Sequence, residues 1–165
     1  MLFKILDGLD KTGLIGRADA HCDIPCGIYD PMPALIAAVS VVRLMDIMNE
    51  GATSDAGPAA LHNMLARNAL RKEEEAEKVK HEIRVIWGDY FKGPLLEKHP
   101  DIHQLAHSIM LKGSACKQDV HRDDGEALVE LVNQFAEKFW ETKGKKTQRL
   151  ETPYAPNLKI VHPIL

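Results

Sequence analysis

The chain has few cysteines, no excess of basic residues and no uninterrupted apolar run of membrane-spanning length. Its three cysteines in 165 residues are an odd number and too few for a disulfide scaffold. Its net charge of −3 argues against nucleic acid as the main partner, because phosphate binding normally requires a basic surface. A transmembrane helix needs about 20 apolar residues, so the sequence predicts no membrane partner either.

The common catalytic motifs are also missing. The sequence has no Gly-rich phosphate loop, no Gly-x-Ser-x-Gly elbow, no His-Glu-x-x-His pair and no Glu-x-x-His motif of the di-iron bundles. Strand-like alternation is scarce, and there is no internal repeat. With 45% hydrophobic and 27% charged residues, the composition is that of an ordinary globular domain.

What the sequence does contain is helical periodicity. Apolar residues recur at three- and four-residue steps, as they do on one face of a helix. The first predicted helix follows the prolines at 31 and 33 and stops at 49–51, and the second covers 58–87. The third begins at 100–101 and stops at the glycine-serine pair 113–114, and the fourth covers 124–143. Short links between four such helices predict an all-α fold, an antiparallel four-helix bundle.

The segment before the first helix combines one histidine with two cysteines: His21-Cys22-Asp23-Ile24-Pro25-Cys26. It follows Ala18-Asp19-Ala20, which has the form of a peptidase site. Cleavage after Ala20 would give His21 a free amine beside its imidazole, while Cys22 offers a thiolate and its backbone nitrogen and Cys26 a second thiolate. Amine, amide nitrogen and two thiolates can lie in one plane, which Ni(II) and Cu(II) prefer and zinc does not. The segment therefore predicts a metal-binding hook.

The hook by itself leaves several functions open. Strong donors bring a Ni(III)/Ni(II) couple into reach, and a metal that cycles by one electron can dismute superoxide. A nickel or copper carrier would use the same ligands without turnover. A dithiol redox protein would use Cys22 and Cys26 as a reversible disulfide and would not need a metal. In a plain helical interaction module, loss of Cys22 would have no effect.

The residues from His21 to Pro31 closely resemble the mature N-terminus of nickel superoxide dismutases. Two further blocks agree: residues 87–92 (WGDYFK) are similar to the family's segment after the second helix, and residues 139–143 (FWETK) to its C-terminal signature. The match runs from about His21 to Lys143. The resemblance implies a four-helix bundle, a nickel ion, superoxide as substrate, a homohexamer and a maturation peptidase that exposes the histidine.

The resemblance also assigns roles to residues. It implies three nickel ligands, which are His21, Cys22 and Cys26. Asp23 and Tyr29 would line the approach, with Tyr29 holding a small anion or water, and Tyr90 would support Tyr29. Lys92 would supply the local positive charge that steers superoxide towards an acidic protein.

Two positions depart from the family. Better-known members carry a glutamate one turn into the first helix, which orients the axial histidine; here that position is Ala37. Those members also carry an arginine on the second helix, where this chain has Glu75. Because such outer partners set the orientation of a ligand ring, a carboxylate from elsewhere or from a neighbouring subunit is expected to replace the missing one.

The sequence therefore predicts three parts. These are a leader over residues 1–20 that is removed on maturation, a dismutase domain over 21–143 (hook 21–31, bundle 32–143) and an irregular C-terminal tail over 144–165, where three prolines lie. Asp7, Asp10 and Lys11 interrupt the apolar region that a secretory signal would need. A cytoplasmic location is therefore expected.

Overall fold

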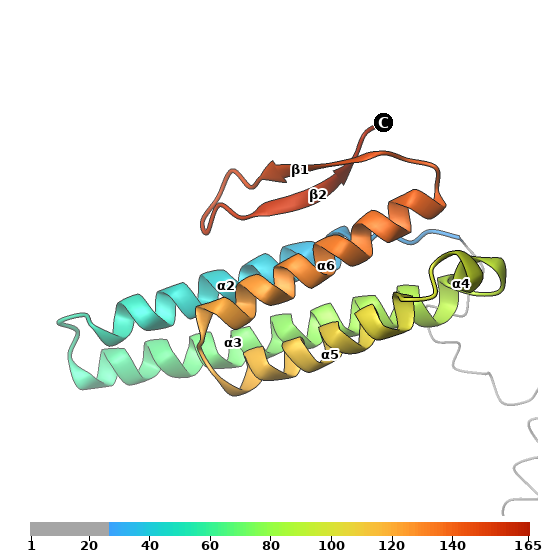
Figure 1. Ribbon diagram of the computed structural model, residues 1–165. Helices are drawn as coiled ribbons and strands as arrows, with labels where there is room; N and C mark the ends of the chain where they lie inside the picture. Colours follow the sequence, from blue (N-terminus) through green and yellow to red (C-terminus); the bar gives the residue numbers. More distant parts are fainter. Residues whose placement is uncertain (1–26) are drawn as a thin grey trace, which may run out of the picture.

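A computed structural model describes residues 27–165, and its long helices lie side by side along their length (Figure 1). The helices are α2 (Met32–Ala52), α3 (Pro58–Val85), α5 (Ile102–Gln118) and α6 (Arg122–Thr142), with a π-helical turn η2 (Ile86–Tyr90) and the short α4 (Pro94–Lys98) between α3 and α5. The predicted four-helix bundle is confirmed. The leader and residues 21–26 lie outside the described residues.

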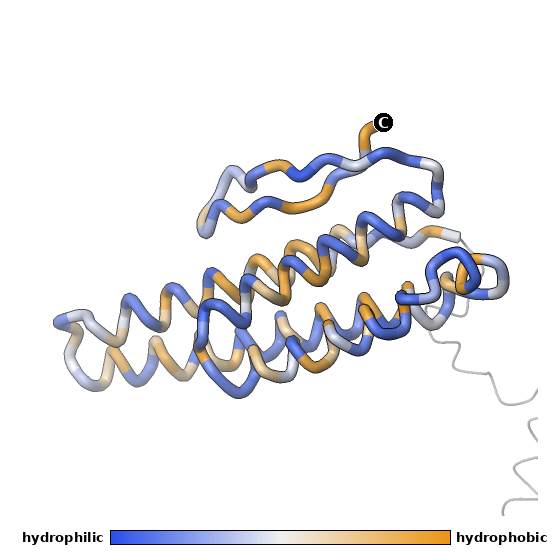
Figure 2. The backbone as a smooth tube through the Cα atoms, in the orientation of Figure 1, coloured by the Kyte–Doolittle hydropathy of each residue, from blue (hydrophilic) through white to orange (hydrophobic). Residues whose placement is uncertain are grey.

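The core of the bundle lies where the apolar stripes of the helices meet. One face of α2 is buried along the whole helix, namely Leu35, Val39, Val42, Met45 and Met48. In α6, Leu128, Val132, Phe135 and Phe139 are buried, while Leu131 is half-buried. Figure 2 shows orange, hydrophobic stretches where neighbouring helices face one another. Each large side chain buried there contributes about 1.5–3 kcal/mol.

Helix α2 is also, among the residues that the structure describes, long and apolar enough to cross a membrane by length and composition alone. Half of that stretch is buried inside the structure. The buried apolar residues of α2 pack in the bundle core.

Helix α3 carries a buried lysine in its apolar stripe. Lys72 is 3% exposed, and its Nζ donates to the carbonyl oxygens of Cys116, Lys117 (3.0 Å) and Asp119 (2.9 Å) at the end of α5. Burial lowers the pKa of Lys72. The last carbonyls of a helix have no N–H partner of their own, so the Lys72 ammonium closes α5 and joins it to α3.

The predicted stop of the third helix at 113–114 is wrong. Helix α5 continues to Gln118, and Gly113 lies buried inside it. A Cβ atom at Gly113 would lie 3.1 Å from Cγ of Lys80 on α3. The glycine therefore serves the close approach of two helices and does not end one.

The prediction of an irregular C-terminal tail is also wrong. Strands β1 (Thr147–Glu151) and β2 (Lys159–Pro163) form an antiparallel hairpin in which Arg149 lies opposite Val161. The hairpin lies along α6 (Figure 1), and Ile160 and Val161 are buried. The prolines of this segment lie in the connecting loop or at the end of β2, where they remove few ladder bonds.

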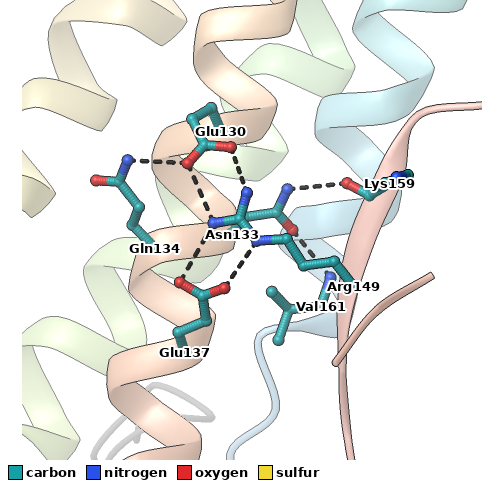
Figure 3. Close-up of polar contacts among 7 residues, drawn as sticks. All are labelled: Glu130, Asn133, Gln134, Glu137, Arg149, Lys159 and Val161. Carbon is teal, nitrogen blue, oxygen red and sulfur yellow. Dashed lines mark hydrogen bonds and ion pairs between the residues drawn. The ribbon is translucent and has the colours of Figure 1, made fainter. Parts of the chain in front are cut away.

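Polar groups of α6 attach this hairpin, as Figure 3 shows. The buried Asn133 donates through Nδ2 to the carbonyl of Lys159 and accepts through Oδ1 from the N–H of Val161, both at 2.9 Å. The outer edge of β2 is thereby paired with a side chain in place of a third strand. Arg149 on β1 forms ion pairs with Glu130 (2.6 Å) and Glu137 (2.8 Å).

Candidate active site

The described chain begins beside the end of the bundle where α2 starts. Gly27 has a φ of +70°, a backbone conformation that glycine adopts without strain. Asp30 accepts a hydrogen bond through Oδ1, at 2.8 Å, from the N–H of Met32, the first residue of α2. The N-cap of this helix is the buried Pro31. Four of the predicted site residues, His21, Cys22, Asp23 and Cys26, lie outside the described residues.

Tyr29 and Tyr90, which the sequence predicts to act together, are brought into contact. Their ring centroids are 5.5 Å apart with an interplanar angle of 52°. Tyr90 ends the π-helical turn η2, where the N–H of Phe91 bonds to the carbonyl of Ile86. Such widened turns occur frequently at functional sites. The contact places a described residue of the predicted hook against η2, which follows α3.

Three residues of the C-terminal signature surround Tyr90. The rings of Tyr90 and Phe139 have centroids 5.0 Å apart, and the hydroxyl oxygen of Tyr90 lies 2.6 Å from Oγ1 of Thr142. The ammonium group of Lys143 lies 4.5 Å from the Tyr90 ring centroid, a cation–π contact. Sequence reasoning missed the roles of Thr142 and Lys143, although both lie in the FWETK block that carried the family resemblance.

Lys92 follows the π-helical turn and is exposed. Its neighbour Phe91 is 2% exposed and packs edge-on against Phe135, with ring centroids 5.7 Å apart. Gly93, with a φ of +52°, then turns the chain into α4. The buried Phe91 and this turn fix the backbone position from which Lys92 reaches solvent.

The two departures from the family are visible in the core. Ala37 is completely buried in α2 and has no polar side chain to offer. Glu75 is 8% exposed, and its Oε1 pairs with Nη2 of Arg71 at 2.9 Å on the same helix. The carboxylate of Glu75 therefore already has a cationic partner.

The remaining thiol and the other potential ligands do not form a second metal site. Between Gly27 and Leu165, no group of three or more His, Cys, Asp or Glu side chains could hold a metal ion. Cys116 is a free thiol with no exposed surface, and burial raises its pKa to about 11. It stays protonated at neutral pH and is unreactive.

Comparisons with known proteins agree with this geometry. The family model for nickel-containing superoxide dismutase matches residues 16–143. The chain is 40% identical over 124 residues to the nickel superoxide dismutase of Streptomyces coelicolor, which covers 75% of this chain and 88% of that protein. It is 38% identical over 127 residues to that of Streptomyces seoulensis, covering 77% of this chain and 91% of the relative.

A solved structure of native nickel superoxide dismutase also matches, with a TM-score of 0.65 and 38% identity over 74% of this chain and 99% of that one. The C-terminal hairpin begins beyond the last residue that the family model matches. Since the family model spans most of the chain and two relatives exceed 30% identity, this chain belongs to the nickel-containing superoxide dismutase family.

Proposed function

We propose that this chain dismutes superoxide at a nickel ion held by its N-terminal hook, after residues 1–20 have been removed. Family membership provides the reaction and the metal: the chain is a superoxide dismutase, superoxide is its substrate and nickel is its cofactor. What we propose here is which residues of this chain perform the reaction. The observation that carries it is the contact of Tyr29, which follows Cys26 by three residues, with Tyr90 at the end of the bundle.

The donor set of the hook fits nickel. His21 would bind through its free amine and its imidazole, Cys22 through its backbone nitrogen and thiolate, and Cys26 through its thiolate. Such a set of nitrogen and thiolate donors would suit Ni(II). When bound, nickel supplies one-electron redox chemistry between the Ni(II) and Ni(III) states. Removal of the leader is essential to this set, because a peptide bond at His21 would abolish the amine donor.

The described residues position the reactants. Tyr29 lies three positions after Cys26, a length of chain that cannot exceed about 11 Å between Cα atoms. Tyr29 is therefore held close to the proposed ligands by its packing against Tyr90. We propose that Tyr29 and Asp23 line the path of superoxide, and that Tyr90 holds Tyr29 in place.

Positive charge at this end attracts the substrate. The whole chain carries a net charge of −3, which repels superoxide at long range. The ammonium group of Lys143 lies 4.5 Å from the Tyr90 ring centroid, and Lys92 is exposed two residues after Tyr90. We propose that these two groups provide a local positive field. Local fields of this kind raise the rate of encounter independently of the net charge.

The ring of His21 would need a hydrogen-bond partner to orient it. Ala37 has no polar group and the carboxylate of Glu75 is paired with Arg71. We propose that a carboxylate from elsewhere in the chain or from a neighbouring subunit of a homohexamer takes this place. A maturation peptidase acting in the cytoplasm would expose His21.

Two forms of the protein test this proposal, the full-length chain and a form that begins at His21. Each is loaded with nickel and assayed for superoxide consumption. We expect activity only in the form that begins at His21. Equal activity in both forms would rule out the free-amine mechanism.

The same proteins separate the alternatives. A nickel or copper carrier would bind metal tightly in the His21 form and consume no superoxide. A dithiol redox protein would be active without metal and in both forms. Cys22→Ser, which should abolish nickel binding in the proposed enzyme, would be neutral in a plain interaction module.

A further inference from the structure

Thr142, the last residue of α6, forms two hydrogen bonds for which the proposed mechanism has no use. Its Oγ1 lies 2.6 Å from the hydroxyl oxygen of Tyr90 and 2.6 Å from the carbonyl oxygen of Phe139. A carbonyl oxygen carries no proton, so the single hydroxyl proton of Thr142 must lie between Thr142 and Phe139. The proton between Thr142 and Tyr90 therefore belongs to Tyr90.

The end of α6 explains this direction. The last carbonyls of a helix have no following turn to supply N–H groups. Here the N–H of Lys143 is directed to the carbonyl of Trp140, the residue after Phe139. The Thr142 hydroxyl donates to Phe139 instead. Its orientation is therefore set by the helix end and not by what occupies the site.

The ring of Tyr90 is held in the corresponding position. It packs against Tyr29 and Phe139, with ring centroids 5.5 and 5.0 Å away, and the Lys143 ammonium lies 4.5 Å from its centroid. Moving the Tyr90 hydroxyl away from Thr142 would break these contacts together.

We propose that Thr142 is a positioning residue: its Oγ1 accepts the hydroxyl proton of Tyr90. The Tyr90 hydroxyl oxygen can then only accept hydrogen bonds from molecules near the hook. This inference rests on the proposed function, which locates the hook beside these tyrosines. Superoxide is an anion without a proton, so a hydroxyl that can only accept does not bind it. Water and hydrogen peroxide can donate to the same oxygen.

The consequence is a division of roles at this end of the bundle. Thr142 makes the Tyr90 side of the site selective for the protonated product and for water. Attraction of the anion is left to the ammonium groups of Lys92 and Lys143.

The hydrogen bond between Tyr90 and Thr142 can be detected in the metal-free, full-length chain by infrared spectroscopy with isotope-labelled tyrosine. The chain has only three tyrosines, and a difference spectrum against Tyr90→Phe assigns the phenol C–O stretching band of Tyr90. Thr142→Val keeps the side-chain shape without the hydroxyl, and Thr142→Ser keeps the hydroxyl. We expect the band to shift in the valine variant and to stay in the serine variant. An unshifted band in Thr142→Val would overturn the inference.

The effect on the site is tested with nickel-loaded protein that begins at His21, with azide as the anion. Thr142→Val frees Tyr90 to donate, so the inhibition constant for azide should fall about fivefold, the factor of one ordinary hydrogen bond. Thr142→Ser should match the wild type. If the infrared band shifts while azide inhibition stays unchanged, the selectivity role of Thr142 is refuted.

Failure of the proposed function gives a different result. Wild-type protein that begins at His21 would then bind nickel without dismutase activity, while the infrared result for Tyr90 would be unaffected. Circular dichroism verifies that each variant keeps its helices. Thr142→Ala, which also lacks the hydroxyl, serves for the infrared measurement in place of a valine variant that does not fold.

Discussion

Replacing Asn133 by alanine should weaken the attachment of the C-terminal hairpin. The Asn133 side chain is 2% exposed and forms two hydrogen bonds of 2.9 Å with the backbone of Lys159 and Val161. Truncation leaves both backbone groups buried at the edge of β2 without a partner, at about 1–1.5 kcal/mol each. We therefore expect the free energy of unfolding to fall by about 2–3 kcal/mol.

Detachment of the hairpin would not avoid this loss. It would hydrate the two backbone groups, but it would also expose Ile160 and Val161, which are 3% and 0% exposed. Burial of each such side chain contributes about 1.5–3 kcal/mol. The docked and the detached states of the variant are therefore both less stable than the wild type.

Urea unfolding followed by far-UV circular dichroism measures the change in free energy, and hydrogen exchange of the Val161 amide shows whether β2 stays docked. Gln134→Ala is the matched control. Gln134 is the next residue of α6, and its amide bonds only to the exposed Glu130 at 3.0 Å. Its truncation should cost less than about 0.5 kcal/mol. Equal losses in the two variants would refute the role of Asn133 as the anchor of the hairpin.

Three further predictions concern charged groups. Lys72→Met removes the donor that closes α5 and should lower the free energy of unfolding by about 2–4 kcal/mol, whereas Lys78→Met, at an exposed position of the same helix, should cost less than about 0.5 kcal/mol; similar losses would contradict the capping role. The Arg149 guanidinium holds the pKa of Glu130 below its ordinary value of 4.5. A lowered carboxyl pKa stabilises the fold above the unfolded-state pKa, and this stabilisation is lost as the pH falls through the folded-state pKa. The difference in unfolding free energy between wild type and Arg149→Ala should therefore shrink from neutral pH to about pH 3, and a constant difference would argue against the ion pair. Lys143→Ala should lower kcat/KM for superoxide about two- to threefold at low ionic strength and less in salt, since exposed charges are screened; stopped-flow measurements would show a salt-independent loss if Lys143 did not steer the substrate.

The bundle could be predicted from the sequence because the inner faces of its helices repeat regularly. The stripe through Leu35, Val39 and Val42 marks α2, and the stripe through Phe135 and Phe139 marks α6. Such a pattern depends only on one helix and its burial. It needs no knowledge of the neighbouring helices.

Features that depend on contacts between two different elements of the fold were not predictable from such a pattern. Gly113 has the local signature of a helix end, but the approach of Lys80 from α3 explains it. Lys72 interrupts an apolar face, and only the position of the α5 terminus shows what it binds. Asn133 is an ordinary helix residue in sequence until β2 lies beside it.

In the candidate site, too, some residues could be identified from the sequence and others only from contacts between elements. Family blocks identify Tyr29, Tyr90 and Lys92, because whole motifs match. The part played by Thr142 depends on the end of α6 meeting a residue 52 positions earlier in the chain. Periodicity cannot show such a contact, although the FWETK block that contains Thr142 marks the region.

Helix α3 is buried only in its second half, and this affects where the protein unfolds locally. None of its residues from 58 to 71, all of which the structure describes, is buried, and in Figure 1 this end projects with α2 past the turn between α5 and α6. Local opening costs least where few apolar contacts are broken, so hydrogen exchange should be fastest there. The opposite end, with Phe91, Phe135 and Phe139, should exchange only on global unfolding. The contact between Tyr29 and Tyr90 lies at this opposite end, so fraying of the far end leaves that contact undisturbed.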